Sequence, residues 1–182
     1  MLLILGLIFI YSSCLIIIFF YALAQLNLLI NYLGEKNKPK NLMKWDFNNS
    51  DEIPFVTIQL PVYNELYVIE RLLLTVEKIE YPCKKLEIQV LDDSDDDSSK
   101  LTKKLIDKIK RNGINIVHLK RKKRTAFKAG ALKEGLKKSK GEFIAIFDSD
   151  FVPNPNFLIK TIPYFKNTKV GMVQTRRGYI NR

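Results

Sequence analysis

Cysteine and histidine are scarce in this 182-residue sequence, which contains two cysteines and one histidine. The cysteines, Cys14 and Cys83, cannot form a disulfide framework, and no cysteine or histidine spacing typical of a metal site is present. These absences exclude a disulfide-stabilised scaffold and a metal centre built from cysteine and histidine. The composition is compatible with a reducing compartment.

Charge of either sign is missing from the first 34 residues. The chain carries 30 Lys and Arg against 19 Asp and Glu, so its whole net charge of +11 lies in the remainder. Such a basic excess is typical of proteins that meet nucleic acid, an anionic membrane surface or phosphate-bearing substrates. The sequence has no helix-turn-helix, zinc-finger or aromatic stacking motif, and we therefore expect no nucleic-acid partner.

Residues 2–24 are almost purely apolar. About 20 such residues span a bilayer as a helix. The triplet Ala22-Leu23-Ala24 resembles a signal-peptide cleavage site, but no Lys or Arg precedes the apolar run, which is longer than the apolar region of a signal peptide. The sequence therefore predicts a transmembrane anchor over residues 1–30.

Residues 31–53 are interpreted as a juxtamembrane connector. Its Trp45 and Phe47 either lie at the lipid headgroups or pack on the following domain. Lysines near a membrane span mark its cytoplasmic side, so we expect a single-pass membrane protein with a cytoplasmic domain over residues 54–182. The lysines that carry this prediction are Lys36, Lys38, Lys40 and Lys44.

Residues 54–182 alternate between strand and helix patterns. This rhythm predicts an α/β fold in which a mostly parallel sheet is covered by helices on both faces. Thr125 is a candidate N-cap of the third helix. The expected strands are residues 55–60, 86–91, 114–119, 143–147 and 170–175, and the expected helices are residues 65–80, 98–111, 125–139 and 156–165.

Ligands of parallel sheets bind beyond the carboxyl ends of the strands. Three polar loops follow the first, second and fourth predicted strands, and we expect them to meet along one crevice. These loops are residues 61–65, 92–94 and 148–150.

Two carboxylates, Asp148 and Asp150, follow the fourth predicted strand with one residue between them. Alternation places both on the same side of an extended chain. This pattern suits a hard divalent cation that also holds phosphate oxygens. The alternative is an ordinary strand end in which Asp forms a turn before Pro153.

Asp92 and Asp93 follow the second predicted strand, where a carboxylate can accept hydrogen bonds from a nucleobase or ribose. The next acids, residues 95–97, fit the start of a helix dipole and are assigned no chemistry. Tyr63 can stack on a base, and Glu65 either bonds a ribose or begins a helix.

The basic segment 120–140 contains Lys128 near a predicted helix N-terminus, beside Ala129 and Gly130. Free backbone amides and a cation in that position suit a diphosphate. The other lysines of the segment fit a solvated face or contact with anionic lipid. His118, in the third predicted strand, fits a packed or edge position.

Five short motifs in this order resemble the inverting family 2 glycosyltransferases, and among them the membrane-bound cellulose-synthase-like and mannan-synthase-like branch. The resemblance covers residues 54–182. The motifs are PVYNE at 61–65, VLDDS at 90–94, FKAGAL at 127–132, FDSD at 147–150 and VQTR at 173–176.

The resemblance implies a Rossmann-like GT-A fold and transfer of a sugar from a UDP- or GDP-hexose to a growing β-linked polysaccharide. By it, Tyr63, Glu65 and Asp93 contact the nucleoside. Lys128 lies near the donor phosphates, and Asp148 and Asp150 hold Mg²⁺ or Mn²⁺. The alternatives are a lipid acceptor, such as a ceramide or polyprenyl phosphate, and a non-catalytic membrane module that binds nucleotide sugars.

The sequence departs from this family on the acceptor side. Residues 151–182 contain no Asp or Glu, so no candidate follows Asp150 for the general base. The family's later Gln and Arg-Trp motif and its further membrane helices are also missing. We therefore expect the base beyond Arg182 and interpret the chain as the donor-binding part of a longer enzyme.

Overall fold

The structure is a computed structural model that describes residues 2–36 and 52–175. The chain divides into two units, residues 1–41 and 42–182. Most of the predicted connector, with Trp45, Phe47 and three of its four lysines, lies outside the described residues, so its boundaries stay a prediction.

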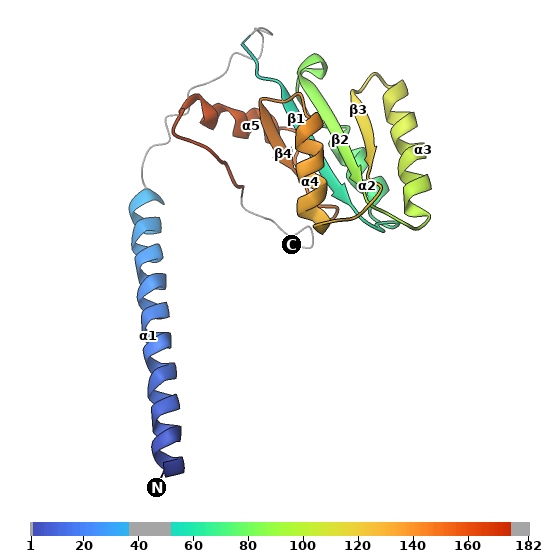
Figure 1. Ribbon diagram of the computed structural model, residues 1–182. Coiled ribbons are helices and arrows are strands. Elements are labelled where there is room, and N and C mark those ends of the chain that lie inside the picture. The colour runs from blue at the N-terminus through green and yellow to red at the C-terminus, as the bar shows by residue number, and fades with distance from the viewer. Residues whose placement is uncertain (1, 37–51, 176–182) are drawn as a thin grey trace. The chain divides into compact units, whose positions relative to one another are not determined.

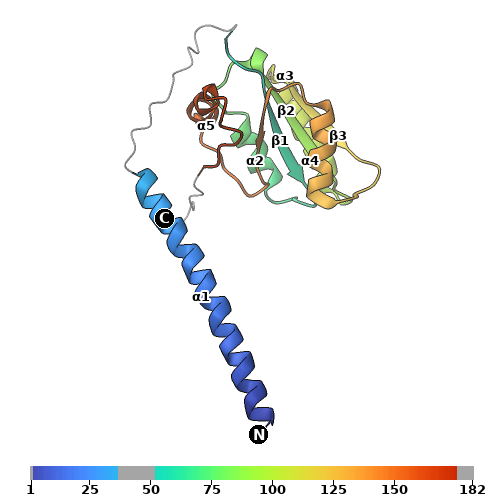
Figure 2. The same cartoon turned by 60° about the vertical axis from the view of Figure 1, so that its left-hand side comes forward.

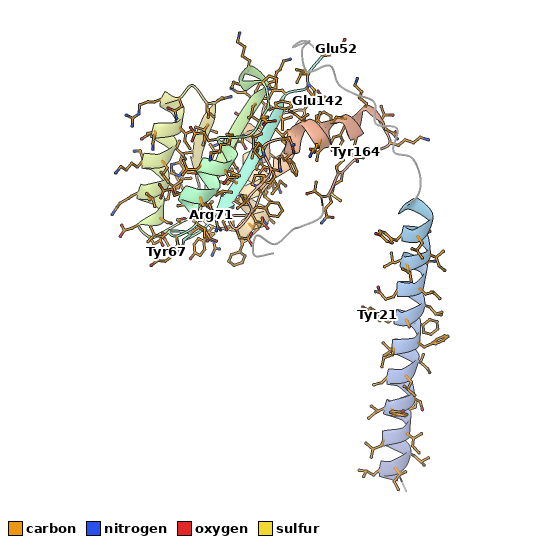
Figure 3. All side chains as sticks on the ribbon, turned by 180° about the vertical axis from the view of Figure 1, so that it is seen from behind. Tyr21, Glu52, Tyr67, Arg71, Glu142 and Tyr164 are labelled. Atoms are coloured by element: carbon orange, nitrogen blue, oxygen red, sulfur yellow. The ribbon has the colours of Figure 1, made fainter. Side chains whose placement is uncertain are left out.

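The N-terminal unit contains one helix, α1 (Leu2–Lys36), which is long and apolar enough to cross a membrane. Figure 3 shows side chains projecting from all around α1, Tyr21 among them. The helix continues beyond the predicted anchor, and at a rise of 1.5 Å per residue it is about 52 Å long. Its polar groups are partly satisfied internally, because Ser13 Oγ donates to the Phe9 carbonyl at 2.8 Å and Asn31 Nδ2 to the Asn27 carbonyl at 3.0 Å.

The second unit is built on a four-stranded, all-parallel sheet with the order β3-β2-β1-β4. Val56, at the start of β1, is paired with Leu86 on one side and Phe143 on the other. This architecture confirms the predicted α/β class (Figure 1). The strands are β1 (Val56–Val62), β2 (Leu86–Asp92), β3 (Ile116–Lys120) and β4 (Phe143–Ile146).

Helices cover both faces of this sheet, as predicted (Figures 1 and 2). One face packs on α2, α3 and α5, whose Leu72, Ile106 and Leu158 share a buried apolar cluster with the strands. The other face packs on α4. The helices are α2 (Ile69–Val76), α3 (Ser98–Arg111), α4 (Phe127–Lys138) and α5 (Phe157–Thr161), with short 3-10 turns at Cys83–Lys85 and Ile162–Lys166.

The face under α4 is polar although it is buried. Thr57 Oγ1 donates to Glu87 Oε2 at 2.9 Å, and Gln59 Nε2 donates to Gln89 Oε1 at 3.0 Å. Helix α4 lies very close to this network, because a Cβ on Gly135 would be 2.7 Å from Gln59 Nε2. The small residue at 135 therefore sets how closely α4 approaches the sheet.

Three predictions about local structure were wrong. Residues 170–175 form no strand, because strand pairing needs a neighbour that local sequence does not reveal. The helix predicted over residues 65–80 begins later, at Ile69, because residues 65–68 form a turn in which Val68 N donates to the Glu65 carbonyl at 3.2 Å. The N-cap of α4 is Ala126 rather than Thr125, and it makes no side-chain capping bond.

Candidate functional site

A cavity of about 360 Å³ lies where the loops after β1, β2 and β4 come together. The expected convergence of these three strand ends is therefore present. Of the predicted site residues, all except Asp92 line this cavity. Its lining residues are Pro61, Val62, Tyr63, Glu65, Leu91, Asp93, Arg124, Lys128, Ala131, Asp148, Ser149 and Asp150.

The loops after β1 and β2 are tied together by polar side chains. Asn64 adopts a left-handed conformation with φ 55°, which asparagine tolerates better than most residues. Its backbone N–H donates to Ser94 Oγ at 2.9 Å, and its side-chain amide donates to Asp95 Oδ1 at 2.9 Å. These bonds hold Tyr63 and Asp93 at the same end of the sheet.

Asp92 points away from the cavity and is fully buried. It accepts hydrogen bonds from Ser94 N at 2.9 Å and Ser99 Oγ at 2.8 Å, and its Oδ2 lies 2.7 Å from His118 Nε2. Burial is the largest influence and acts to raise the pKa of Asp92, but the bonds from His118, Ser94 and Ser99 outweigh it and hold the pKa well below its usual range. Asp92 therefore links the end of β2 to α3 and β3, on the opposite side of the chain from Asp93.

Asp93 is held by Arg121, a residue that the sequence reasoning did not select. The Arg121 guanidinium binds both carboxylate oxygens, with Nε 2.8 Å from Oδ1 and Nη2 paired with Oδ2. The same guanidinium donates to the carbonyls of Thr125 at 2.8 Å and Phe127 at 3.0 Å. Arg121 thus links the end of β2 to the start of α4.

The start of α4 is strained, because Ala126 and Phe127 have φ angles of 54° and 46°. Left-handed backbone is unfavourable for residues with a side chain, and for a bulky residue it is an outlier. The hydrogen bonds from Arg121 offset this cost. Glycine is required nearby, because a Cβ on Gly130 would be 2.0 Å from the Thr125 carbonyl oxygen and 2.5 Å from Arg121 Nη1.

Lys128, in the first turn of α4, forms an ion pair with Asp148. Both side chains are about half exposed, at 52% and 48%. A positive charge therefore lies at the first of the two predicted metal-binding carboxylates, within the cavity.

Glu65 is joined to the loop that carries Asp148 and Asp150. Its Oε1 accepts a hydrogen bond from Ser149 Oγ at 2.8 Å, while its backbone carbonyl accepts from Ile69 N at 3.0 Å and so begins α2. Glu65 therefore connects the loop after β1 to the loop after β4 that contains Asp148 and Asp150. Ser149, the residue between the two aspartates, was not selected from the sequence.

The described residues contain no group of three or more His, Cys, Asp and Glu side chains arranged to hold a metal ion. Asp148 and Asp150 are two carboxylates on the wall of one cavity. This set fits Mg²⁺ or a similar hard cation, which proteins hold through one or two carboxylates together with substrate phosphates. It does not fit an ion enclosed by protein ligands alone.

Arg124 is a further residue that the sequence reasoning missed. Its guanidinium carbon lies 3.3 Å from the centroid of the Tyr63 ring and 5.0 Å from that of Phe127. The segment RKKR marks the loop as basic, but it contains four cations in a row. Sequence alone does not tell which of the four contact the strand ends. In the structure, Arg121 binds Asp93 and Arg124 stacks on Tyr63.

Comparison with known proteins places this geometry in a family. The family model described as glycosyl transferase family 2 matches residues 57–182. The chain is 37% identical to glucomannan 4-beta-mannosyltransferase 7 of Arabidopsis thaliana, over 95% of this chain and 34% of that protein. It is 39% identical to glucomannan 4-beta-mannosyltransferase 1 of Cyamopsis tetragonoloba, over 88% of this chain and 32% of that protein. The chain thus spans about a third of the length of these curated relatives.

Solved structures agree on the fold. A mannosyltransferase from Pyrobaculum calidifontis, in complex with GDP-Man and Mn²⁺, shares 27% identity and a TM-score of 0.64 over 79% of this chain and 41% of that chain. TarS of S. aureus, at 24% identity, has a TM-score of 0.54 over 63% of this chain and 20% of that chain. The parallel sheet and the helices packed on it form a fold of the GT-A type. The chain belongs to glycosyl transferase family 2.

Proposed function

We propose that this chain is the donor-binding part of an inverting glycosyltransferase that moves a sugar from a nucleotide-diphosphate donor to a β-linked polysaccharide. The observation that carries the proposal is the shared cavity after β1, β2 and β4. It gathers an aromatic ring, a cation and several carboxylates from three separate loops. These groups match three parts of such a donor, namely the base, the ribose and the diphosphate.

The nucleoside and the diphosphate of the donor each have candidate partners. Tyr63 offers a ring for the base, and Asp93, oriented by Arg121, offers carboxylate oxygens to the nucleoside. Lys128 offers positive charge to the diphosphate. Asp148 and Asp150 would hold Mg²⁺ or Mn²⁺, which when bound offsets charge on the leaving diphosphate.

We further propose that the donor is a GDP-hexose, with mannose as the sugar, rather than a UDP-hexose. Two curated relatives are glucomannan mannosyltransferases, and the Pyrobaculum calidifontis mannosyltransferase was solved with GDP-Man. A comparison of GDP-mannose with UDP-glucose binding to the purified chain tests this choice. Tighter binding of UDP-glucose would contradict it.

The chain is expected to bind the donor without transferring the sugar efficiently. Deprotonation of the acceptor hydroxyl requires a general base. Residues 151–182 contain no Asp or Glu, and the base is expected outside residues 1–182. Sustained transfer of labelled mannose by the purified chain would overturn this expectation.

We place this donor site on the cytoplasmic side of a membrane. The support is the long apolar helix α1 and the lysines that follow it in the sequence. Protease protection of the chain in sealed membrane vesicles of known orientation tests this, and protection of residues 54–182 when the cytoplasmic side faces outward would contradict it.

The proposed function is tested by titrating GDP-mannose into the full chain in detergent, with and without Mn²⁺. We expect Asp150→Ala to weaken Mn²⁺-dependent binding by tenfold or more, which is about 1.4 kcal/mol. Asp107→Ala, which removes an exposed carboxylate on α3, is the matched control and should bind as the wild type does. Equal binding by Asp150→Ala would contradict the assigned metal role.

A further inference from the structure

The ring of Tyr63 is already covered in this structure. The Arg124 guanidinium carbon lies over it at 3.3 Å from the ring centroid, and the same carbon lies 5.0 Å from the centroid of the Phe127 ring. Tyr63 and Arg124 line one cavity together with Asp93 and Lys128. A cation therefore occupies a face of the aromatic ring that is proposed to receive the nucleobase.

Arg124 is held less firmly than the cations beside it. Arg121 is bound to Asp93, and Lys128 is bound to Asp148. Across residues 52–175, by contrast, the structure gives Arg124 stacking contacts but no hydrogen bond or ion pair. A cation on an exposed aromatic face contributes about two- to fivefold to an equilibrium constant. Displacement of Arg124 therefore costs a ligand little, but the cost is measurable.

A guanidinium and a nucleobase cannot share one face of a ring. Both are planar and stack in direct contact with it, so a base that takes this face of Tyr63 moves Arg124 away. The displaced guanidinium keeps its charge and its five N–H donors. It remains in a cavity of about 360 Å³ that contains Lys128 and the two aspartates, where a donor diphosphate is proposed to lie.

We propose that Arg124 is a specificity-determining residue of the donor pocket. It covers Tyr63 when the pocket is empty, leaves when a base enters, and then contacts the diphosphate. A nucleoside has to displace Arg124 without any compensation. A nucleoside diphosphate recovers the cost through a charge-assisted contact with the phosphate. The pocket therefore favours ligands that carry both a base and a diphosphate. This inference rests on the proposed donor-binding function.

The test compares guanosine and GDP as ligands, with Mn²⁺ present, on the full chain and two variants. For Arg124→Ala we expect guanosine to bind about two- to fivefold tighter, because nothing covers the ring. We expect GDP to bind at least fivefold weaker, because one phosphate contact is lost. Arg124→Lys, which keeps the charge but not the planar stack, should lie between Arg124→Ala and the wild type with both ligands, because an ammonium still contacts a ring face. Lys123→Ala, in the same loop, is the control and should change neither.

Weaker guanosine binding by Arg124→Ala would overturn the inference, because it would make Arg124 a part of the base pocket. Unchanged GDP binding would overturn it as well, while leaving the proposed function intact. Failure of the wild-type chain to bind GDP would overturn the proposed function and this inference together.

A measurement without ligand tests the stack directly. The Arg124 side-chain protons should show an upfield ring-current shift in the NMR spectrum of the empty chain. Most of the shift should be lost in Tyr63→Leu and on addition of GDP, because the Phe127 ring is farther from the guanidinium than the Tyr63 ring is. A shift that is absent from the empty chain, or that persists at saturating GDP, would overturn the inference.

Discussion

The two faces of the sheet are buried to a similar degree but are built from different chemistry. Toward α2, α3 and α5 the strands present Ile58, Leu60 and Val90, all essentially without solvent exposure. Toward α4 they present polar side chains that are also buried and that bond to one another, namely Thr57, Gln59, Glu87 and Gln89. A parallel sheet covered on both faces is usually apolar on both.

This difference suggests separate roles for the two faces, one in the stability of the domain and one in the placement of α4. Apolar packing is non-directional, so the first face supplies most of the driving force for folding. Hydrogen bonds are directional, and a satisfied buried network favours a single arrangement. The second face carries α4, and α4 carries Lys128. We infer that the polar face fixes the position of Lys128, while the apolar face supplies most of the stability of the domain.

The largest effect should come from the apolar face. Leu72→Ala removes a fully buried side chain of α2 and should lower the free energy of unfolding by about 2–5 kcal/mol, because it leaves a cavity. Urea unfolding of the full chain measures this loss. Leu74→Ala, on the same helix but 39% exposed, is the matched control. A similar loss of unfolding free energy from both variants would contradict the role given to the buried apolar face.

A smaller effect should come from the polar face. Glu87 Oε2 accepts from Thr57 Oγ1 at 2.9 Å, from Lys140 N at 3.2 Å and from Gln89 Nε2 at 3.3 Å. Glu87→Gln replaces one acceptor oxygen with an amide donor and should cost about 1–3 kcal/mol of unfolding free energy. GDP binding should weaken too, because α4, which carries Lys128, is no longer held in one position on the sheet.

The control for this variant is Glu134→Gln, an α4 carboxylate that pairs with Lys137 at the surface. Surface changes of this kind usually stay within about 0.5 kcal/mol. If Glu87→Gln lowers stability but leaves GDP affinity unchanged, the polar face does not position the cation.

The smallest effect concerns Asp92, the carboxylate at the end of the apolar face. Its pKa is lower in the folded chain than in the unfolded chain, where Asp titrates near pH 3.9. Its ionised form therefore stabilises the fold fully above about pH 4, and this contribution is lost as the pH falls toward the folded-state pKa. One such group changes the unfolding free energy by at most about 1.4 kcal/mol per pH unit.

Urea unfolding of the wild type and of Asp92→Asn between pH 5 and pH 2 measures this contribution. The variant should lose less stability on acidification than the wild type does. Asp107→Asn, on the exposed side of α3, should keep the wild-type slope. Parallel slopes for wild type and Asp92→Asn would show that the bonds from His118, Ser94 and Ser99 do not favour the ionised form.

Much of the fold followed from spacing in the sequence. Apolar runs located the four strands, and helical periodicity with a stop at Asn112 and Gly113 located α3 with its observed ends. The convergence of three loops followed from the rule for parallel sheets. Residues 170–175 have the composition of a strand but form none, because a strand also depends on its neighbour.

The site was less predictable because it depends on which way side chains point. Alternation along β2 places Asp92 on the side of Val90, so its burial could have been read from the pattern. The roles of Arg121 and Arg124 could not, because they depend on the path of a strained loop. Its left-handed residues, Ala126 and Phe127, are of types that ordinarily avoid this conformation.

The length of α1 has a consequence for any bilayer that it would cross. The helix is about 52 Å long, whereas the hydrocarbon layer of a bilayer is about 30 Å thick. A surplus of this size is absorbed by inclination of the helix or by its extension into the headgroup region. Because a change of inclination costs little, a helix of this length can adjust to bilayers that differ in thickness.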